Sequence, residues 1–201
     1  MYAARVNRLC GLRPGYMFSE TKPARIVDPV TGKARDIEVP TFNDTIMLHA
    51  LVSQIDDCFP FSPVDVSRPG LHACASVVLA AEQRRQRPEP WKERLLANRP
   101  MPLSALVADV KQAFPSANLE AILTSPAAMR HLPESLRNTL RAIYKFYSPS
   151  GIGIPLGLPT SPALFRIAMA EVDAFLLSLN LPAFRYVDDI LVLVPRTMEE
   201  G

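Results

Sequence analysis

Residues 184–194 read FRYVDDILVLV, in which two adjacent carboxylates, Asp188 and Asp189, separate two apolar runs. Runs rich in Val, Ile, Leu and Tyr predict β-strands. Asp is common in turns because its side chain hydrogen-bonds to the nearby backbone. The segment therefore predicts a β-hairpin with an acidic turn, which is either solvated or holds a positive group.

A third carboxylate ends another apolar run. Residues 103–110 read LSALVADV and predict a strand that is almost wholly apolar until Asp109. An acid at the end of a buried strand is costly unless it is paired or bound to a metal. A predicted helix over residues 161–179, with Ser161 as its N-cap, separates this strand from the hairpin. This strand–helix–hairpin order can bring Asp109 and the two hairpin carboxylates to one edge of a sheet.

Three carboxylates packed together repel one another unless cations neutralise them. The three cysteines and three histidines are scattered without metal-ligand spacing, so neither structural zinc nor a disulfide framework is expected. Oxygen ligands without nearby His or Cys favour Mg²⁺ or Mn²⁺. Two such ions about 3.5–4 Å apart are the usual device for phosphoryl transfer on nucleotides. The three acids thus predict a two-metal centre.

Composition limits the class of protein. With 201 residues, 48% hydrophobic and 21% charged, the chain is typical of a globular protein of one or two domains. No stretch approaches roughly 18 uncharged apolar residues, and the N-terminus has no apolar core of a signal peptide, so neither a membrane span nor secretion is expected. The scattered cysteines favour a reducing cytoplasm.

Charge is unevenly spread behind the net value of +2. Residues 1–36 hold seven Lys and Arg against three Asp and Glu, whereas residues 171–201 hold two against six. A basic front half with an acidic end suits a polyanion held near a cation site. Plain sequence fluctuation explains it equally well.

The first half of the chain predicts a hairpin and two helices. Residues 25–40 predict two strands around a Thr31-Gly32 turn. Asn43 or Asp44 is the expected N-cap of the next helix. The doublet Asp56-Asp57 falls at the end of that helix, without flanking strands, and is expected to be exposed. A second helix is predicted after a Ser67 cap. In the second half of the chain, a further helix is predicted over residues 133–147.

Several blocks, in the right order over nearly the whole chain, resemble the reverse transcriptase family in its bacterial intron, retron and defence-like branch. YVDD matches the most specific signature of the family, and VADVKQAF is similar to its first catalytic motif, an Asp followed five residues later by an aromatic. GIPLGLPTSPALF resembles the G-x-P-x-G…SP block. GKARDIEVP and SRPGLHACASVV resemble two segments of the fingers.

The resemblance implies catalytic roles for three residues and a metal site of four. Asp109, Asp188 and Asp189 would be catalytic, and the carbonyl of Val110 would join them as metal ligands. Asp109 and Asp188 would bind both Mg²⁺ ions, for which Mn²⁺ is a possible substitute, and Asp189 would support one.

The resemblance also implies nucleotide-binding roles. Lys33 and Arg35 would hold the triphosphate, which suits the bidentate fit of Arg to phosphate; a solvated strand face is the alternative. Phe114 falls on the steric-gate position that would exclude a ribose 2′-hydroxyl, unless it is an ordinary core residue. Gly157 would let the backbone approach the template and nucleotide closely. Tyr186 would lie near the primer end or simply pack in its strand.

The implied fold is α+β, with the fingers and palm of a right-hand polymerase and without a thumb. Fingers are expected over residues 1–100 and, as a return segment, over residues 118–150. The first palm segment, with the first catalytic Asp, is expected over residues 101–117. The second, with the YVDD hairpin, is expected over residues 151–201.

The implied function is RNA-directed DNA polymerisation from a primer 3′-hydroxyl, with an RNA template, a DNA primer and dNTPs as partners. Two departures from the family matter: Leu156 replaces the usual Gln, and the chain stops at Gly201, before the later palm segments and the thumb. The chain is then a fragment, a degenerate copy or one part of a split enzyme with a separate thumb-bearing chain. The alternatives are a defence-type polymerase with untemplated or protein-primed synthesis, and an inactive nucleic-acid-binding remnant.

Overall fold

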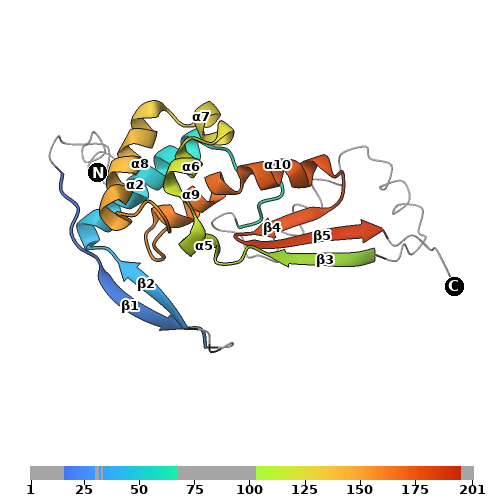
Figure 1. The fold of residues 1–201 in the computed structure, drawn as a ribbon, viewed down its shortest axis with the longest axis horizontal. Coiled ribbons are helices and arrows are strands. Elements are labelled where there is room, and N and C mark those ends of the chain that lie inside the picture. Colours follow the sequence, from blue (N-terminus) through green and yellow to red (C-terminus); the bar gives the residue numbers. More distant parts are fainter. Residues whose placement is uncertain (1–15, 30–31, 33, 68–102, 196–201) are drawn as a thin grey trace, which may run out of the picture. The chain divides into compact units, whose positions relative to one another are not determined.

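The computed structural model describes residues 16–29, 32, 34–67 and 103–195 (Figure 1). They form a mixed α and β fold, in agreement with the predicted fold class. The chain divides into two compact units, each made of two stretches of sequence. Unit 1 comprises Met1–Pro60 and Gln112–Ala168, and unit 2 comprises Phe61–Lys111 and Met169–Gly201.

The predicted hairpin is present in unit 1. Strands β1 (Lys22–Val27) and β2 (Ala34–Val39) pair antiparallel, with Arg25 opposite Asp36. The Arg25 guanidinium donates two hydrogen bonds to that carboxylate, at 2.7 and 3.1 Å. Gly32 lies between the strands with a φ of 68°, a conformation that favours glycine.

Helix α2 (Phe42–Cys58) begins at a different cap from the one predicted. Its N-cap is Thr41, whose hydroxyl accepts the amide hydrogen of Asp44 at 3.3 Å. Asn43 and Asp44 both lie inside the helix. Asp44 is buried there and accepts hydrogen bonds from the Tyr16 hydroxyl and the Ser19 amide, at 2.6 and 3.1 Å. The prediction of the cap was wrong because Asp44 binds the preceding segment instead.

Five more helices lie in the described part of unit 1: α5 (Ala113–Ser116), α6 (Leu119–Leu123), α7 (Pro126–His131), α8 (Glu134–Tyr147) and α9 (Thr160–Ala168). Two of them start at polar caps that satisfy first-turn amides. Asn118 caps α6, and Ser125 caps α7. Helix α2 packs against α9, and α6 packs against both α8 and α9.

The helix predicted over residues 161–179 is in fact two helices. α9 ends at Ala168, and α10 (Ala170–Ser178) follows after Met169, which has φ −86° and ψ 0°. The interruption falls at the boundary between the two units. Ser161 is not a cap: it lies inside α9, and its hydroxyl donates to the Pro155 carbonyl.

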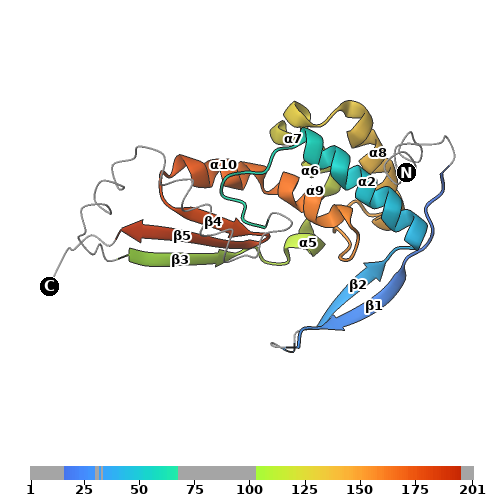
Figure 2. The same cartoon turned by 180° about the vertical axis from the view of Figure 1, so that it is seen from behind.

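In the described part of unit 2, three strands form an antiparallel sheet in the order β3-β5-β4. Its strands are β3 (Leu103–Asp109), β4 (Ala183–Tyr186) and β5 (Asp189–Pro195), as the two predicted strand regions require. Helix α10 lies along one face of this sheet, as both ribbon views show (Figures 1 and 2). Val64, Leu176, Ala183 and Val192 form the core between them.

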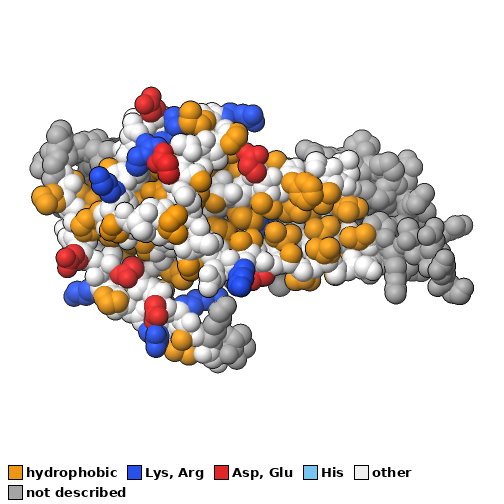
Figure 3. All heavy atoms as spheres, viewed as in Figure 1, with side chains coloured by type: hydrophobic (Ala, Val, Ile, Leu, Met, Phe, Trp, Pro, Cys, Tyr) orange, Lys and Arg blue, Asp and Glu red, His pale blue; other side chains and the backbone are white. Residues whose placement is uncertain are grey.

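β3 is not the buried strand that its sequence predicts. It is an outer strand of the sheet, and its described side chains are exposed, including Leu106 at 54% and Val107 at 73%. Hydrophobic side chains gather on the visible surface over α10 and the strands (Figure 3). An apolar sequence indicates that a strand tends to be buried. Whether the strand lies in the centre or at the edge of its sheet depends on tertiary pairing, which the local sequence does not determine.

Two predictions fall partly or wholly outside the described residues. The helix predicted after Ser67 lies within residues 68–102, and Lys33 is also outside the described part of the chain. In the part that the structure does describe, no helix is long and apolar enough to cross a membrane.

Candidate active site

The acidic turn is a two-residue hairpin connection. Tyr186 pairs with Asp189, so Val187 and Asp188 form the turn between β4 and β5. Val187 has a φ of 58°, which is unusual for a β-branched residue. The left-handed conformation costs roughly 1–2 kcal/mol for a residue other than glycine. Contacts elsewhere must therefore hold this turn in place.

The sheet register brings the predicted acids of β3 and β5 together. Asp109 is directly opposite Asp189. Side chains of directly opposite residues lie on the same face, with Cα atoms about 4.5–5.5 Å apart. The Val110 amide donates to the Asp188 carbonyl at 3.3 Å, which joins the end of β3 to the turn. The backbone thus gathers all four residues of the predicted metal site at one end of the sheet.

The side chains do not form a ready-made metal cage. Asp109 and Asp189 are exposed, and Asp188 is half-buried. Within the described residues, no three Asp, Glu, His or Cys side chains are grouped so that they could hold a metal ion. The donor set is nevertheless suited to a hard divalent cation, because it offers carboxylate and carbonyl oxygens only.

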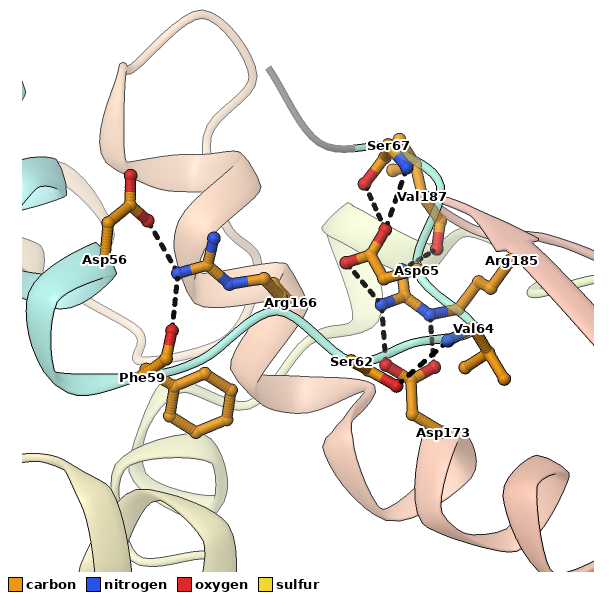
Figure 4. Close-up of polar contacts among 10 residues, drawn as sticks. All are labelled: Asp56, Phe59, Ser62, Val64, Asp65, Ser67, Arg166, Asp173, Arg185 and Val187. Carbon is orange, nitrogen blue, oxygen red and sulfur yellow. Dashed lines mark hydrogen bonds and ion pairs between the residues drawn. The ribbon is translucent and has the colours of Figure 1, made fainter. Parts of the chain in front are cut away.

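A buried cluster of charges lies behind the turn (Figure 4). Arg185 of β4 is 1% exposed and donates to both carboxylate oxygens of Asp173 on α10, at 2.6 and 2.8 Å. Asp65 forms an ion pair with the same guanidinium at 2.8 Å. Burial raises the pKa of Asp173, the Arg185 hydrogen bonds lower it, and the Asp65 carboxylate adds to the rise, with a net upward shift.

In unit 1, the predicted steric-gate residue belongs to an aromatic pair. Phe114 lies on α5, is half-buried and stacks on Phe165 of α9, with ring centroids 4.6 Å apart and planes inclined by 22°. Phe114 is therefore only partly accessible, and its ring packs on Phe165 inside the unit.

The two other described nucleotide-binding candidates both involve β2. Arg35 is exposed on this strand, opposite Ile26. Gly157 has a φ of 98°, and a Cβ atom there would lie 2.4 Å from the Glu38 carbonyl oxygen. The Glu38 amide also donates to the Leu156 carbonyl at 2.7 Å. Close approach to β2 thus requires a glycine at position 157 on structural grounds.

The doublet Asp56-Asp57 at the end of α2 was predicted to be exposed, and this is correct only for Asp57. Asp56 accepts a hydrogen bond from Arg166 at 2.7 Å, while Asp57 is exposed. The same guanidinium donates to the Phe59 carbonyl at 3.4 Å (Figure 4). Arg166 interrupts an apolar helix and is buried, which is why it recruits a carboxylate.

A comparison with protein families decides what kind of protein carries this site. The family model described as "Reverse transcriptase (RNA-dependent DNA polymerase)" matches residues 21–200. The chain belongs to the reverse transcriptase family. A comparison with curated protein sequences gave no significant match.

Membership of the reverse transcriptase family defines the general chemistry. It supports a nucleotidyl-transferring polymerase that binds a nucleic-acid template, a primer and nucleotides. Reverse transcriptases generally use divalent metals, which agrees with the oxygen donors at the end of the sheet. The match also spans every described residue predicted for this site.

The Arg185 cluster of this reverse transcriptase domain was not predicted from the sequence. A signal was present, because Arg185 lies within an apolar strand and Asp173 within an apolar helix. Buried charges of opposite sign in neighbouring elements are expected to pair. Asp65 carries no such signal, since it lies in a short irregular segment.

Proposed function

We propose that this chain is an RNA-directed DNA polymerase that adds deoxynucleotides to a primer 3′-hydroxyl by two-metal catalysis. The observation that carries the proposal is the register of Asp109 opposite Asp189, with Asp188 in the adjoining turn, in a member of the reverse transcriptase family. In the reaction the primer hydroxyl attacks the α-phosphate, a new phosphodiester bond forms, and pyrophosphate leaves.

The carboxylates have distinct roles in this proposal. Asp109 and Asp188 hold both Mg²⁺ ions, Asp189 supports one, and the Val110 carbonyl completes a coordination shell. When bound, the ions neutralise phosphate charge and activate the attacking hydroxyl. The exposure of Asp109 and Asp189 leaves their side chains room to turn toward a cation.

Four residues outside the acidic turn bind the incoming nucleotide. Lys33 and Arg35 hold the triphosphate, and the exposure of Arg35 on β2 is consistent with this role. Phe114 excludes a ribose 2′-hydroxyl with the accessible part of its ring. The loop at Gly157 approaches the nucleotide and the template, and Tyr186, which is exposed on β4, lies near the primer end.

The chain supplies part of a right-hand polymerase, whose fingers and palm do not coincide with the two compact units. Residues 1–100 and 118–150 form the fingers, and residues 101–117 and 151–201 form the palm. The palm assignment rests on the antiparallel sheet that carries Asp109 and Asp189 at one end, with Asp188 in the adjoining turn.

Primer extension tests the proposal. The purified chain is incubated with Mg²⁺, dNTPs and a labelled DNA primer, alone or annealed to an RNA or a DNA template. We expect products that copy the RNA template and disappear when EDTA removes the metal. Extension of the primer alone would instead indicate untemplated synthesis, and binding of primer–template without extension under any condition would indicate an inactive nucleic-acid-binding protein.

A further inference from the structure

The turn that carries Asp188 accepts a hydrogen bond from a buried side chain, that of Arg185. Nη1 of Arg185 donates to the Val187 carbonyl at 2.8 Å (Figure 4). That carbonyl belongs to the peptide group whose nitrogen is that of Asp188. Because a peptide group is planar, fixing its carbonyl also fixes the direction in which the chain enters Asp188. The bond acts on Val187, the residue at φ 58°.

Arg185 is itself held from two sides. Nε and Nη2 donate to the two carboxylate oxygens of Asp173, and Asp65 pairs with Nη2 at 2.8 Å. All three side chains are at most 3% exposed. A guanidinium is a rigid planar fork with five donors, so two nitrogens fixed on a carboxylate determine where the third one points.

The backbone of Arg185 is also held, by hydrogen bonds to the segment of residues 64–67. The Arg185 amide donates to the Val64 carbonyl at 2.8 Å, and the Val66 amide donates to the Arg185 carbonyl at 2.9 Å. Asp65 accepts hydrogen bonds from the Ser67 amide, at 3.0 Å, and from the Ser67 hydroxyl. Residues 64–67 thus anchor both the backbone and the charge partner of Arg185.

We propose that Arg185, anchored by Asp173 and Asp65, is a positioning residue that sets the orientation of the Asp188–Asp189 turn for metal binding. The inference rests on the proposed function, because it assigns a purpose to the fixed turn of that same site. Stability alone does not require such a cluster, since apolar side chains of similar volume often serve a buried site as well as an ion pair. Only the planar guanidinium of Arg can contact two carboxylates and the turn carbonyl at once in this geometry.

The substitution that tests this role is Arg185→Lys. Lysine keeps the positive charge, but its single ammonium cannot reproduce the fork that joins Asp173 to the Val187 carbonyl. Arg166→Lys is the matched control. Arg166 is also buried and also bonds a carboxylate and a backbone carbonyl, those of Asp56 and Phe59, but it belongs to α9.

Two readouts are taken on folded protein, and neither needs polymerase activity. Amide hydrogen exchange of residues 186–190 is measured without metal, and the dissociation constant for Mn²⁺ is measured by electron paramagnetic resonance. We expect Arg185→Lys to accelerate exchange in the turn by about tenfold or more. We also expect it to weaken Mn²⁺ binding by roughly 10- to 100-fold, as loss of a group that orients metal ligands typically does. Arg166→Lys should change both values by less than about twofold.

Several outcomes would overturn the assignment. Unchanged exchange in a folded Arg185→Lys protein would mean that the turn keeps its conformation without Arg185. Faster exchange with an unaltered Mn²⁺ affinity would mean that Arg185 has only a structural role. If the wild type binds no Mn²⁺, the proposed function fails, while exchange alone still decides whether Arg185 holds the turn. If Arg185→Lys does not fold, Asp173→Asn replaces it, with the same pattern expected at smaller size and the same results overturning the role.

Discussion

At the scale of the residue, Phe114 is where the choice of sugar is tested. If part of its ring excludes the 2′-hydroxyl, Phe114→Val should raise the ratio of kcat/KM for ribonucleotides to that for deoxynucleotides, by up to roughly a hundredfold. Primer extension on one template with both nucleotide sets measures this ratio.

The aromatic pair supplies the control for that experiment. Phe165→Leu removes the same stacking contact, whose centroids are 4.6 Å apart, but alters the ring that is almost fully buried. It should lower stability without moving the ratio. A ratio that stays constant in a folded and active Phe114→Val protein would show that the sugar is read elsewhere.

Gly157 gives a second prediction at this scale. Gly157→Ala should destabilise the fold more than Gly151→Ala, although both glycines have a positive φ. At Gly151 nothing lies within 4 Å of the added Cβ, so only the conformational cost of roughly 1–2 kcal/mol applies. At Gly157 the Cβ also meets the Glu38 carbonyl oxygen, which should add about 1 kcal/mol or more. Urea unfolding measures both losses, and equal losses would contradict the close approach to β2.

At the scale of the element, the hydrogen bond that joins α8 to α9 makes a pH-dependent contribution to stability. The Tyr144 hydroxyl lies 2.8 Å from that of Thr160, and burial raises the pKa of Tyr144 to about 12. A tyrosine in the unfolded chain ionises near pH 10. Between these values the folded state binds more protons than the unfolded state, so stability falls as the pH rises.

Tyr144→Phe isolates this contribution. The free energy of unfolding is measured in urea at pH 9 and pH 11, for the wild type and the variant. The wild type should lose about 1 kcal/mol more than the variant over this range. A difference between the two proteins that stays constant from pH 9 to pH 11 would contradict the burial of this hydroxyl, because the other tyrosines cancel in the comparison.

The elements also differ in how far local sequence predicts them. Both hairpins were predictable because an alternating or apolar run and its turn lie within about a dozen neighbouring residues. The cap of α2 was not, because Asp44 binds Tyr16, 28 residues earlier in the chain. The interruption of the helix at Met169 was not predictable either, because no glycine or proline marks it in the sequence.

At the scale of the whole molecule, the sequence predicts the mixed fold class and the reverse transcriptase family correctly, and the family model confirms the latter. The division into two units was beyond local reasoning, since each unit combines two distant stretches of chain. The exposure of β3 was missed for the same reason: the order β3-β5-β4 is a property of the assembled sheet. The Arg185 cluster likewise exists only after three separate segments have come together.

The proposed polymerase function depends most on the acidic end of that sheet, and one substitution tests it. Asp188→Asn keeps the size and shape of the side chain but removes the charge that would hold both ions. The loss of several kcal/mol of metal-assisted stabilisation corresponds to about a thousandfold or more in rate. Asp57→Asn, which alters an exposed Asp of the other acidic doublet, is the matched control.

The measurement is the rate of primer extension on an RNA template with Mg²⁺ as the only divalent metal, alongside thermal unfolding of each protein. We expect Asp188→Asn to be folded and inactive, and Asp57→Asn to extend the primer like the wild type. Near-normal extension by a folded Asp188→Asn protein would contradict the assignment of this turn as the metal-binding centre.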